Sequence, residues 1–387
     1  MRKIAPILLL RLALLVAVLA CAVLVVEHQN AGDPAFCGMA SGCMAVRRSA
    51  WSRIGPIPLP VIGLSAHAVL LALALGVRDK VHTYYLAALA TAGGIIAGAL
   101  IALQTFQIGA FCKWCLMVDG SAIVAALAAS WLHRETAGSL AYEAWLGALS
   151  RRRAQIVLWA GGAVIAGLLP IVWGEYPVVA PLPEGVAALA VPGKITVVSF
   201  TDFECPFCRK MHPVLHDIVN QSGGRMTLVR KMAPLAGHRG AKPAALGYLC
   251  APADKREKMA GMLYAAPEHL LNRDGVIGIA AGLGIDRATF TACLAAPETE
   301  AALAADEALF AAIDAQALPF TFIGPRVVAG ANPTAARKIA RVVLAGGRPG
   351  LPVSWMLAAF AALAVIVVAL TLRLAPGDDQ PIAVPAS

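Results

Sequence analysis

Six long apolar runs constrain the fold of this 387-residue chain more than any other feature. Each is long enough to cross the apolar core of a bilayer as a helix. The chain is 59% hydrophobic and 14% charged, which is far too apolar for a soluble protein. Arg11, in the first run, is expected to snorkel toward the cytoplasmic face. The six predicted spans cover about residues 4–26, 59–77, 83–106, 115–132, 155–173 and 353–372.

The segment at 175–350 differs in composition from the six runs, because its charge rises and its periodicity becomes mixed. A proline-rich linker extends to about residue 193. Residues 194–200 are apolar and β-branched, which predicts a strand. Alanine-rich helical segments follow, and strands are predicted again at 319–328. The chain therefore combines a membrane α-helical bundle, a four-helix core plus a linking span, with an α/β domain that has a helical insertion.

Arginine and lysine residues in the loops predict the orientation of the bundle. With six spans, the basic residues near the N-terminus, at 78–80, at 134–153 and at 373 share one side, which is then cytoplasmic. These loops account for much of the net charge of +9. No basic stripe with interleaved aromatics is present, so no nucleic-acid partner is expected. Arg47, Arg48 and Arg53, in the first outer loop, are exceptions to the rule.

Three cysteine pairs fall on the opposite, extracytoplasmic side of this topology. Two of them have the Cys-x-x-Cys spacing of a reversible dithiol. Electrons pass between protein dithiols by direct sulfur exchange, so three pairs on one side predict a thiol relay. Zinc is a poor alternative because neither Cys-x-x-Cys has a second pair or a histidine at ligand spacing. The pairs are Cys37 with Cys43, Cys112 with Cys115, and Cys205 with Cys208.

The three remaining cysteines have other predicted roles. Cys250 and Cys293 both lie in the helical insertion and are interpreted as a structural disulfide, with buried free thiols as the alternative. Cys21 lies within the first apolar run, where packing is the expected role. Eight cysteines that can be placed in four pairs indicate an oxidising compartment.

The soluble segment has the order strand, Cys-x-x-Cys, helix, with the motif Asp202-Phe203-Glu204-Cys205-Pro206-Phe207-Cys208. Cys205 would begin the helix, where backbone N–H groups and the helix dipole lower a thiol pKa. Together with Leu318-Pro319, this motif resembles the DsbA-like branch of the thioredoxin superfamily over about residues 190–345. The resemblance implies a thioredoxin-like fold with Pro319 as a cis-proline facing the motif. His212, one turn after Cys208, is expected at the surface.

The membrane segment resembles the vitamin K epoxide reductase family over about residues 5–132. The resemblance is carried by the loop Cys37-Gly-Met-Ala-Ser-Gly-Cys43, by Ser49, and by Cys112-Lys113-Trp114-Cys115 on the fourth span. It implies that the loop cysteines shuttle electrons, that Cys112 and Cys115 are the active site, and that a quinone binds among the helices. Ser49 matches the family's Ser/Thr after the second loop cysteine.

Several features of the membrane segment bear on the quinone site. Asp119 lies one turn after Cys115 on the same helix face, where it could exchange a proton with a bound acceptor. A hydrogen bond to neighbouring helices is the alternative role for Asp119. Leu59 and Asp119 stand roughly where the vertebrate enzymes have Asn and Tyr. The sixth span is an addition to the usual five-span fusion.

Four regions are predicted from these patterns. Residues 1–132 form the epoxide reductase-like membrane domain, and residues 133–174 form a cytoplasmic loop and the fifth span. Residues 175–350 form the extracytoplasmic DsbA-like domain, and residues 351–387 form the sixth span and a short cytoplasmic tail. The expected location is the bacterial plasma membrane.

The predicted function is disulfide formation in secreted or periplasmic proteins that carry reduced cysteines. Electrons would pass from substrate thiols through Cys205/Cys208, Cys37/Cys43 and Cys112/Cys115 to ubiquinone or menaquinone of the membrane pool, with Cys115 nearest the quinone. One alternative is a reductive or isomerising conduit, although no cysteine pair on the cytoplasmic side could supply its electrons. A second, non-enzymatic alternative is a membrane-anchored binding module or chaperone with structural disulfides.

Overall fold

The computed structural model describes residues 3–29, 35–37, 42–179, 181–313, 315, 317–347 and 350–376. The described residues form two compact units. The membrane unit comprises the chain up to residue 177, apart from residues 30–34, together with the chain from residue 351 onward. The soluble unit comprises residues 178–350. The last helix therefore belongs to the membrane unit although it follows the soluble one in sequence.

Within the described residues, six helices are long and apolar enough to cross a membrane. They correspond to the six predicted runs, and most of their ends lie within three residues of the predicted ones. The fourth helix extends six residues further. The helices are α1 (Ala5–Gln29), α3 (Leu59–Gly76), α4 (Lys80–Leu103), α5 (Lys113–Gly138), α7 (Arg153–Gly174) and α16 (Val353–Leu374).

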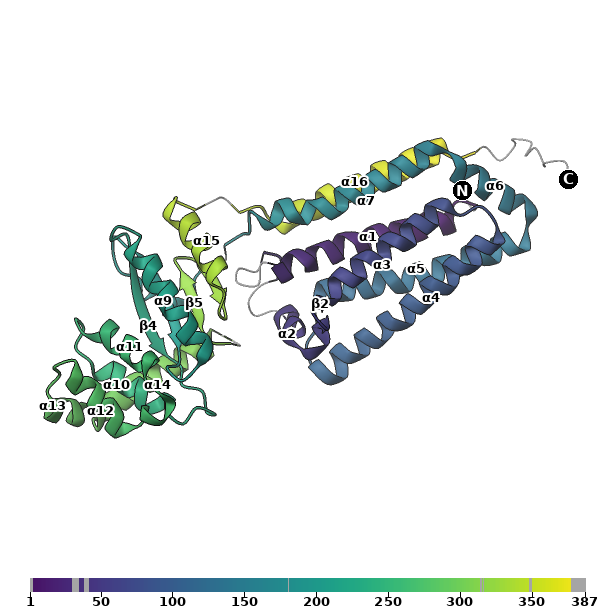
Figure 1. The fold of residues 1–387 in the computed structure, drawn as a ribbon. Coiled ribbons are helices and arrows are strands. Elements are labelled where there is room, and N and C mark those ends of the chain that lie inside the picture. The colour runs from purple at the N-terminus through teal and green to yellow at the C-terminus, as the bar shows by residue number, and fades with distance from the viewer. Residues whose placement is uncertain are drawn as a thin grey trace. The chain divides into compact units, whose positions relative to one another are not determined.

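Helix α1 is the central helix of the membrane unit, since it packs against α3, α5 and α7. Helix α4 packs along α5 and completes the four-helix core. Helices α7 and α16 lie side by side (Figure 1), and a hydrogen bond of 2.9 Å joins Trp159 Nε1 to Thr371 Oγ1. The sixth span thus packs on the linking span.

Arg11 does not snorkel as predicted, because it faces the interior of the bundle. Its side chain is fully buried, and its Nε and Nη2 donate to the carbonyl oxygen of Ala74 at 3.3 and 3.0 Å. Ala74 lies in the last turn of α3, where carbonyl groups have no partner within the helix. The guanidinium also lies 5.8 Å from the ring centroid of Trp159. Arg11 therefore joins α1 to α3 and α7.

The predicted loops of the membrane unit contain short elements that the sequence analysis did not identify. Helix α6 (Leu140–Arg151) buries Tyr142, Trp145, Leu146 and Leu149, the i, i+3, i+4, i+7 pattern of an amphipathic helix. The first outer loop and the turn before α5 contain the other elements. These are α2 (Gly42–Arg48), η1 (Ala50–Ser52), the strand pair β1 (Arg53–Ile54) and β2 (Ile57–Pro58), and the π-helix η2 (Gln104–Ile108).

The soluble unit is built on a four-stranded sheet with strand order β4-β3-β5-β6. Strand β3 pairs parallel with β4 and antiparallel with β5, and β5 pairs antiparallel with β6. Strand β4 was predicted as helical; its buried Arg230 interrupts the apolar pattern of a strand. The strands are β3 (Ile195–Thr201), β4 (Met226–Met232), β5 (Phe320–Ile323) and β6 (Arg326–Ala329).

Helices α9 (Pro206–Asn220) and α15 (Pro333–Leu344) share one apolar core with the sheet, in which Val197 of β3 packs with Met211 and Ile339. On β3, Phe200 points to the other side and stacks on Phe310 of α14 (Pro297–Ala312). Because side chains alternate along a strand, Thr201 shares the α9 side with Val197. The sheet therefore lies between α9 and α14.

The insertion between β4 and β5 is helical, as predicted. Cys250, at the end of α10, forms a disulfide with Cys293 of α13. This is the pairing that the sequence analysis favours. A short helix, α8 (Glu184–Ala187), lies in the predicted linker. Besides α14, the insertion contains α10 (Ala241–Cys250), α11 (Arg256–Ala265), η3 (Glu268–Leu270), α12 (Arg273–Gly282) and α13 (Arg287–Leu294).

Candidate redox site

Four cysteines of the membrane unit form one continuous series. Cys43 lies within hydrogen-bonding reach of Cys37 and of Cys112, and Cys112 lies within reach of Cys115. The backbone N–H of Cys115 also donates to Cys112 Sγ at 3.2 Å. These contacts, together with burial, raise the pKa of both Cys37 and Cys112. The loop pair and the Cys-x-x-Cys are thus neighbours, in the order in which disulfide exchange would use them.

The end of α1 holds the Cys37 loop in place. The Glu27 carboxylate accepts hydrogen bonds from the backbone N–H groups of Phe36 and Cys37, the latter at 3.2 Å. Arg47 Nη1 donates to the Glu27 carbonyl oxygen at 2.8 Å and lies 3.8 Å from its carboxylate. Arg47 was an exception to the positive-inside pattern, and this structural contact explains its position.

Trp114, between the two cysteines of Cys-Lys-Trp-Cys, connects α5 to the same loop. Its indole N–H donates to the Phe36 carbonyl oxygen at 3.4 Å, and the two rings meet edge to face with centroids 6.2 Å apart. Both side chains are buried in one apolar cluster with Cys37, Cys43 and Cys112. Trp114 therefore helps to hold the loop pair against α5.

Gly42 allows the loop helix α2 to approach the turn before α5. A Cβ atom at Gly42 would lie 2.4 Å from the carbonyl oxygen of Phe111, a distance that real Cβ atoms do not reach. Phe111 is next to Cys112, and Gly42 is next to Cys43. The absence of a side chain at Gly42 is therefore what lets the two cysteines meet.

Gln104, which the sequence analysis missed, links Asp119 to the active cysteines. Its Oε1 accepts from the backbone N–H of Cys112 at 3.0 Å, and its Nε2 donates to Asp119 Oδ2 at 3.4 Å. Gln104 begins the π-helix η2, and such interruptions are frequent at functional sites. A single polar residue at the end of an apolar run carries no pattern that sequence reasoning could detect.

A cavity of about 250 Å³ lies among α1, α3, α4 and α5, and all four cysteines of the series line it. Its walls are mainly apolar, as in most small-molecule sites. Asp119, Ser49 and Leu59, which the sequence analysis singled out, also line it. Cys21 was expected to serve packing, but it lines the cavity beside His67, with Sγ 4.0 Å from Nδ1. The cavity thus joins the four cysteines of the series to a mainly apolar space.

The second candidate centre lies in the soluble unit, where Cys205 is the N-cap of α9 and Pro206 occupies the first turn. Hydrogen bonds from the Cys208 side chain and from the backbone N–H groups of Cys208 and Phe207 lower the pKa of Cys205 to about 6, although burial opposes this. Burial raises the pKa of Cys208. The two thiols therefore differ strongly in acidity, as the predicted position at a helix N-terminus requires.

Pro319 lies at the same end of the sheet as the Cys-x-x-Cys. The Leu318–Pro319 peptide bond is cis. Strand β5 begins at Phe320, opposite Phe200, so Pro319 falls beside Thr201, where β3 ends. The chain reaches Cys205 four residues after Thr201. The register thus brings Pro319 to the active-site end of β3.

The acidic residues of the motif anchor a neighbouring loop. Asp202 is buried and accepts from His238 Nδ1 at 2.7 Å and from the backbone N–H of Leu235 at 3.0 Å. Glu204 accepts from the backbone N–H of Gly240 at 2.6 Å. The hydrogen bond to Asp202 raises the pKa of His238. The sequence analysis did not identify His238, which lies over thirty residues away.

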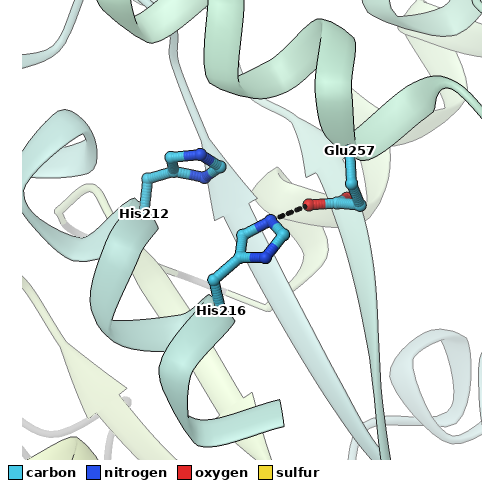
Figure 2. A group of neighbouring side chains, drawn as sticks. All are labelled: His212, His216 and Glu257. Atoms are coloured by element: carbon cyan, nitrogen blue, oxygen red, sulfur yellow. Dashed lines mark hydrogen bonds and ion pairs between the residues drawn. The ribbon is translucent and has the colours of Figure 1, made fainter. Parts of the chain in front are cut away.

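His212 was expected at the surface, and the structure shows it only partly exposed. Its ring packs against Tyr264, with centroids 4.8 Å apart, and its Nδ1 accepts from Arg230 at 2.7 Å. Figure 2 shows it beside His216 and Glu257; the three have ligand atoms within 4.8 Å of one another. Helix α11, which carries Glu257, covers this side of α9, and the sequence spacing does not reveal that cover.

Comparison with known proteins agrees with both centres. Residues 7–131 match the sequence model of the vitamin K epoxide reductase family, and residues 192–339 match a thioredoxin model. The chain therefore joins a vitamin K epoxide reductase domain to a thioredoxin-like domain. This composition supports a thiol–disulfide oxidoreductase in a membrane, and it confirms the predicted fold class. No curated protein sequence matches the chain significantly.

Three solved structures illustrate the similarity of the soluble unit. A thioredoxin-like oxidoreductase from Silicibacter pomeroyi DSS-3 is 26% identical, with 40% of this chain and 89% of that one covered and a TM-score of 0.36. The thiol-disulfide exchange protein alpha-DsbA2 from Wolbachia pipientis is 18% identical, with coverage of 50% and 99% and a TM-score of 0.36. BdbD from Bacillus subtilis is 18% identical, with coverage of 41% and 91% and a TM-score of 0.37.

Replacing Gly42 by alanine should separate Cys43 from Cys112. In a Cys37→Ser, Cys115→Ser background, mild oxidation can join Cys43 only to Cys112 within this series. A misplacement of about 1 Å costs on the order of a hundredfold in rate, so Gly42→Ala should slow this crosslink by about tenfold or more. Non-reducing mass spectrometry of the peptides measures the rate. Gly120→Ala is the control, because its Cβ would meet no neighbouring atom within 4 Å; equal rates in both variants would refute the role of Gly42.

The lowered pKa of Cys205 predicts a specific pH dependence of its reactivity. In the reduced protein, its alkylation by iodoacetamide should rise with pH around a midpoint of about 6, because only the thiolate reacts. Below that pH the thiol is protonated and the rate falls about tenfold per unit. Peptide mass spectrometry resolves Cys205 from the other cysteines. A midpoint of 8 or above would contradict the geometry described here.

Proposed function

We propose that this protein is a membrane thiol oxidase that forms disulfide bonds in secreted or periplasmic proteins and passes the electrons to a quinone. The observation that carries the proposal is the unbroken series Cys37, Cys43, Cys112 and Cys115 beside an apolar cavity. Disulfide exchange requires contact between sulfurs, and this series provides it. The family match supports quinone as the acceptor, because the family is linked to quinones.

The first steps are exchanges at the soluble centre. A substrate thiolate attacks Cys205 of the Cys205–Cys208 disulfide, forms a mixed disulfide and releases Cys208 as a thiolate. The second substrate thiolate then attacks the substrate sulfur, closes the substrate disulfide and releases Cys205. Two electrons now reside on the Cys205–Cys208 dithiol. The low pKa of Cys205 favours this direction, since a stabilised thiolate makes the pair a stronger oxidant.

The membrane centre then takes up these electrons. Cys205 and Cys208 reduce the Cys37–Cys43 disulfide, with Cys37 as the first sulfur attacked. The released Cys43 thiolate attacks Cys112, and the Cys112–Cys115 disulfide opens with Cys115 as the leaving thiolate. The Cys37 thiolate then attacks Cys43, which re-forms the Cys37–Cys43 disulfide and releases Cys112 as a thiolate. Each step moves one electron pair from one sulfur pair to the next and leaves the donor pair oxidised. The order follows the contacts between neighbouring thiols.

The cavity residues would hold the quinone, ubiquinone or menaquinone. A bound quinone would accept two electrons and two protons. Cys115 and Asp119 line the cavity, so we assign Cys115 to the sulfur nearest the acceptor and Asp119 to the proton. The Gln104 side chain fixes the Asp119 carboxylate. Ser49, whose hydroxyl donates to the Val46 carbonyl oxygen at 2.7 Å, would shape the wall of the cavity, and Pro319 would shape the substrate side of the soluble centre.

The predicted location and boundaries belong to the same proposal. Helices of the membrane unit would place the chain in the bacterial plasma membrane, with the soluble unit on the extracytoplasmic side. The proposed regions remain 1–132, 133–174, 175–350 and 351–387. On this topology all three redox pairs share one aqueous border, which the relay requires.

Removing Cys115 should stop transfer to quinone and leave the upstream pairs reduced. Purified full-length protein in detergent is supplied with a reduced dithiol peptide and a soluble ubiquinone or menaquinone analogue as sole acceptor. Cys115→Ser should abolish quinone reduction while Cys205 and Cys208 accumulate as thiols, seen by mass-tagged alkylation. A Cys250→Ser, Cys293→Ser variant is the control, because it also lacks cysteines but keeps every relay pair. Wild-type turnover by Cys115→Ser would refute the proposed order.

Protease treatment of intact spheroplasts tests the topology. The protease should digest the soluble unit at 178–350 without lysis, because the proposal places that unit outside the cytoplasm. Immunoblotting with an antibody to this unit follows its loss, and a cytoplasmic marker protein controls for leakage. Protection of the unit until the spheroplasts are lysed would place it on the wrong side for the relay.

A further inference from the structure

The residues drawn in Figure 2 have metal-ligand chemistry, but a buried arginine already occupies the place of a cation. Arg230 has 1% side-chain exposure, and its Nε and Nη2 lie 3.1 Å from the Glu257 carboxylate. Its Nη2 also donates to His212 Nδ1 at 2.7 Å. A metal ion here would face a fixed positive charge and compete for the same two side chains. The cluster therefore acts as a support for Arg230.

The supported arginine lies against the ring of Tyr264. Its guanidinium carbon is 5.8 Å from the ring centroid. His212 and Phe203 also pack on Tyr264, with centroid distances of 4.8 and 4.7 Å. Burial, with Arg230 and His216, lowers the pKa of His212 to about 4, so His212 is neutral at pH 7 and can accept from Arg230. Tyr264 is thus held in one orientation, with a positive charge beside its ring.

The Tyr264 hydroxyl links this group of side chains to the end of β3 that precedes the Cys-x-x-Cys. It is hydrogen-bonded to Thr201 Oγ1, and both residues are buried. Thr201 lies on the α9 side of β3, the side that carries Cys208, and its hydroxyl lowers the pKa of Cys208 against the larger effect of burial. Two hydroxyl groups therefore connect the buried cysteine to the ring beside Arg230.

We propose that Thr201, positioned by Tyr264 and Arg230, donates a hydrogen bond to the Cys208 thiolate whenever that sulfur leaves or attacks in disulfide exchange. When a thiolate attacks Cys205, a new bond forms to its Sγ, the Cys205–Cys208 bond breaks, and the electron pair goes to Cys208 Sγ. The proposal requires the Thr201 O–H to donate to this sulfur and Thr201 Oγ1 to accept from the Tyr264 hydroxyl, an arrangement that the hydrogen bond between the two hydroxyls allows. No external proton donor is needed at this step.

This hydrogen bond matters because Cys208 is 2% exposed and water cannot solvate its charge. A leaving thiolate departs faster when its pKa is lower. A preorganised donor in a dry site stabilises developing charge without solvent reorganisation. Arg230 increases the effect, since a cation beside the ring makes the Tyr264 hydroxyl a stronger donor. The proposal rests on disulfide exchange at Cys205–Cys208 and requires neither a quinone nor a particular direction of flow.

The test measures the two exchange steps separately, with reduced glutathione and no quinone. In full-length protein, the initial rate of opening of the Cys205–Cys208 disulfide is followed by acid quench, alkylation and peptide mass spectrometry. Thr201→Val, which keeps the shape but lacks the hydroxyl, should slow opening by about tenfold, and Tyr264→Phe by about threefold. Thr201→Ser should restore most of the rate. Tyr248→Phe is the matched control, because Tyr248 also stacks on Phe203 but directs its hydroxyl to Glu257.

A second measurement separates this role from general damage to the site. In a Cys208→Ser background, glutathione is placed on Cys205, and its release by excess thiol is timed. Cys205 is the leaving group in this reaction, so Thr201→Val and Tyr264→Phe should leave the rate within about twofold. Unchanged opening in both variants would overturn the proposal. So would equal slowing of opening and release, because that pattern shows a distorted site and not a lost donor to Cys208.

Discussion

Disulfide exchange occurs only when two sulfur atoms come into contact. The packing of the membrane unit meets this requirement. Three contacts made by other residues hold the loop pair against the Cys-x-x-Cys. The Glu27 carboxylate accepts a hydrogen bond from the backbone N–H of Cys37, and the Trp114 indole donates to the Phe36 carbonyl oxygen. The third is the close approach of Gly42 to the backbone of Phe111. The packing of the helices alone would not fix the position of this loop. Because these contacts come from α1, α2 and α5, the packing of the bundle determines whether the cysteines can meet.

The two centres place their cysteines in opposite electrostatic settings. At Cys205 the hydrogen bonds favour the thiolate and lower its pKa to about 6, whereas burial and thiol–thiol hydrogen bonds raise the pKa of Cys37 and Cys112. A stabilised thiolate makes Cys205 a good leaving group in disulfide exchange. At Cys112, which has Cys43 and Cys115 within reach, contact between sulfurs supplies the speed that acidity would otherwise provide.

Sequence patterns predicted the spans, the strand before Cys205 and the helical insertion, because hydropathy and periodicity are local signals. They did not predict β4, where Arg230 breaks the apolar pattern, or α6, which lay in an assumed loop. Arg11 and His212 were both placed near water. Each is instead covered by an element distant in sequence: α3 and α7 over Arg11, and α11 over His212. Gln104, His238 and Tyr264 were missed for the same reason, since their roles arise from contacts across the fold.

Both Cys-x-x-Cys motifs share a feature that the cysteine spacing does not reveal. In each, a polar side chain lies at the more buried cysteine, and a second polar residue holds that side chain in place. In the membrane unit Gln104, linked to Asp119, binds the backbone of Cys112. In the soluble unit Thr201, hydrogen-bonded to Tyr264, is the proposed donor to the thiolate of Cys208. Gln104 thus fixes the backbone that carries one buried sulfur, and Thr201 is the proposed partner of the other, which water cannot solvate. The motif supplies the sulfurs, and the surrounding fold supplies that partner.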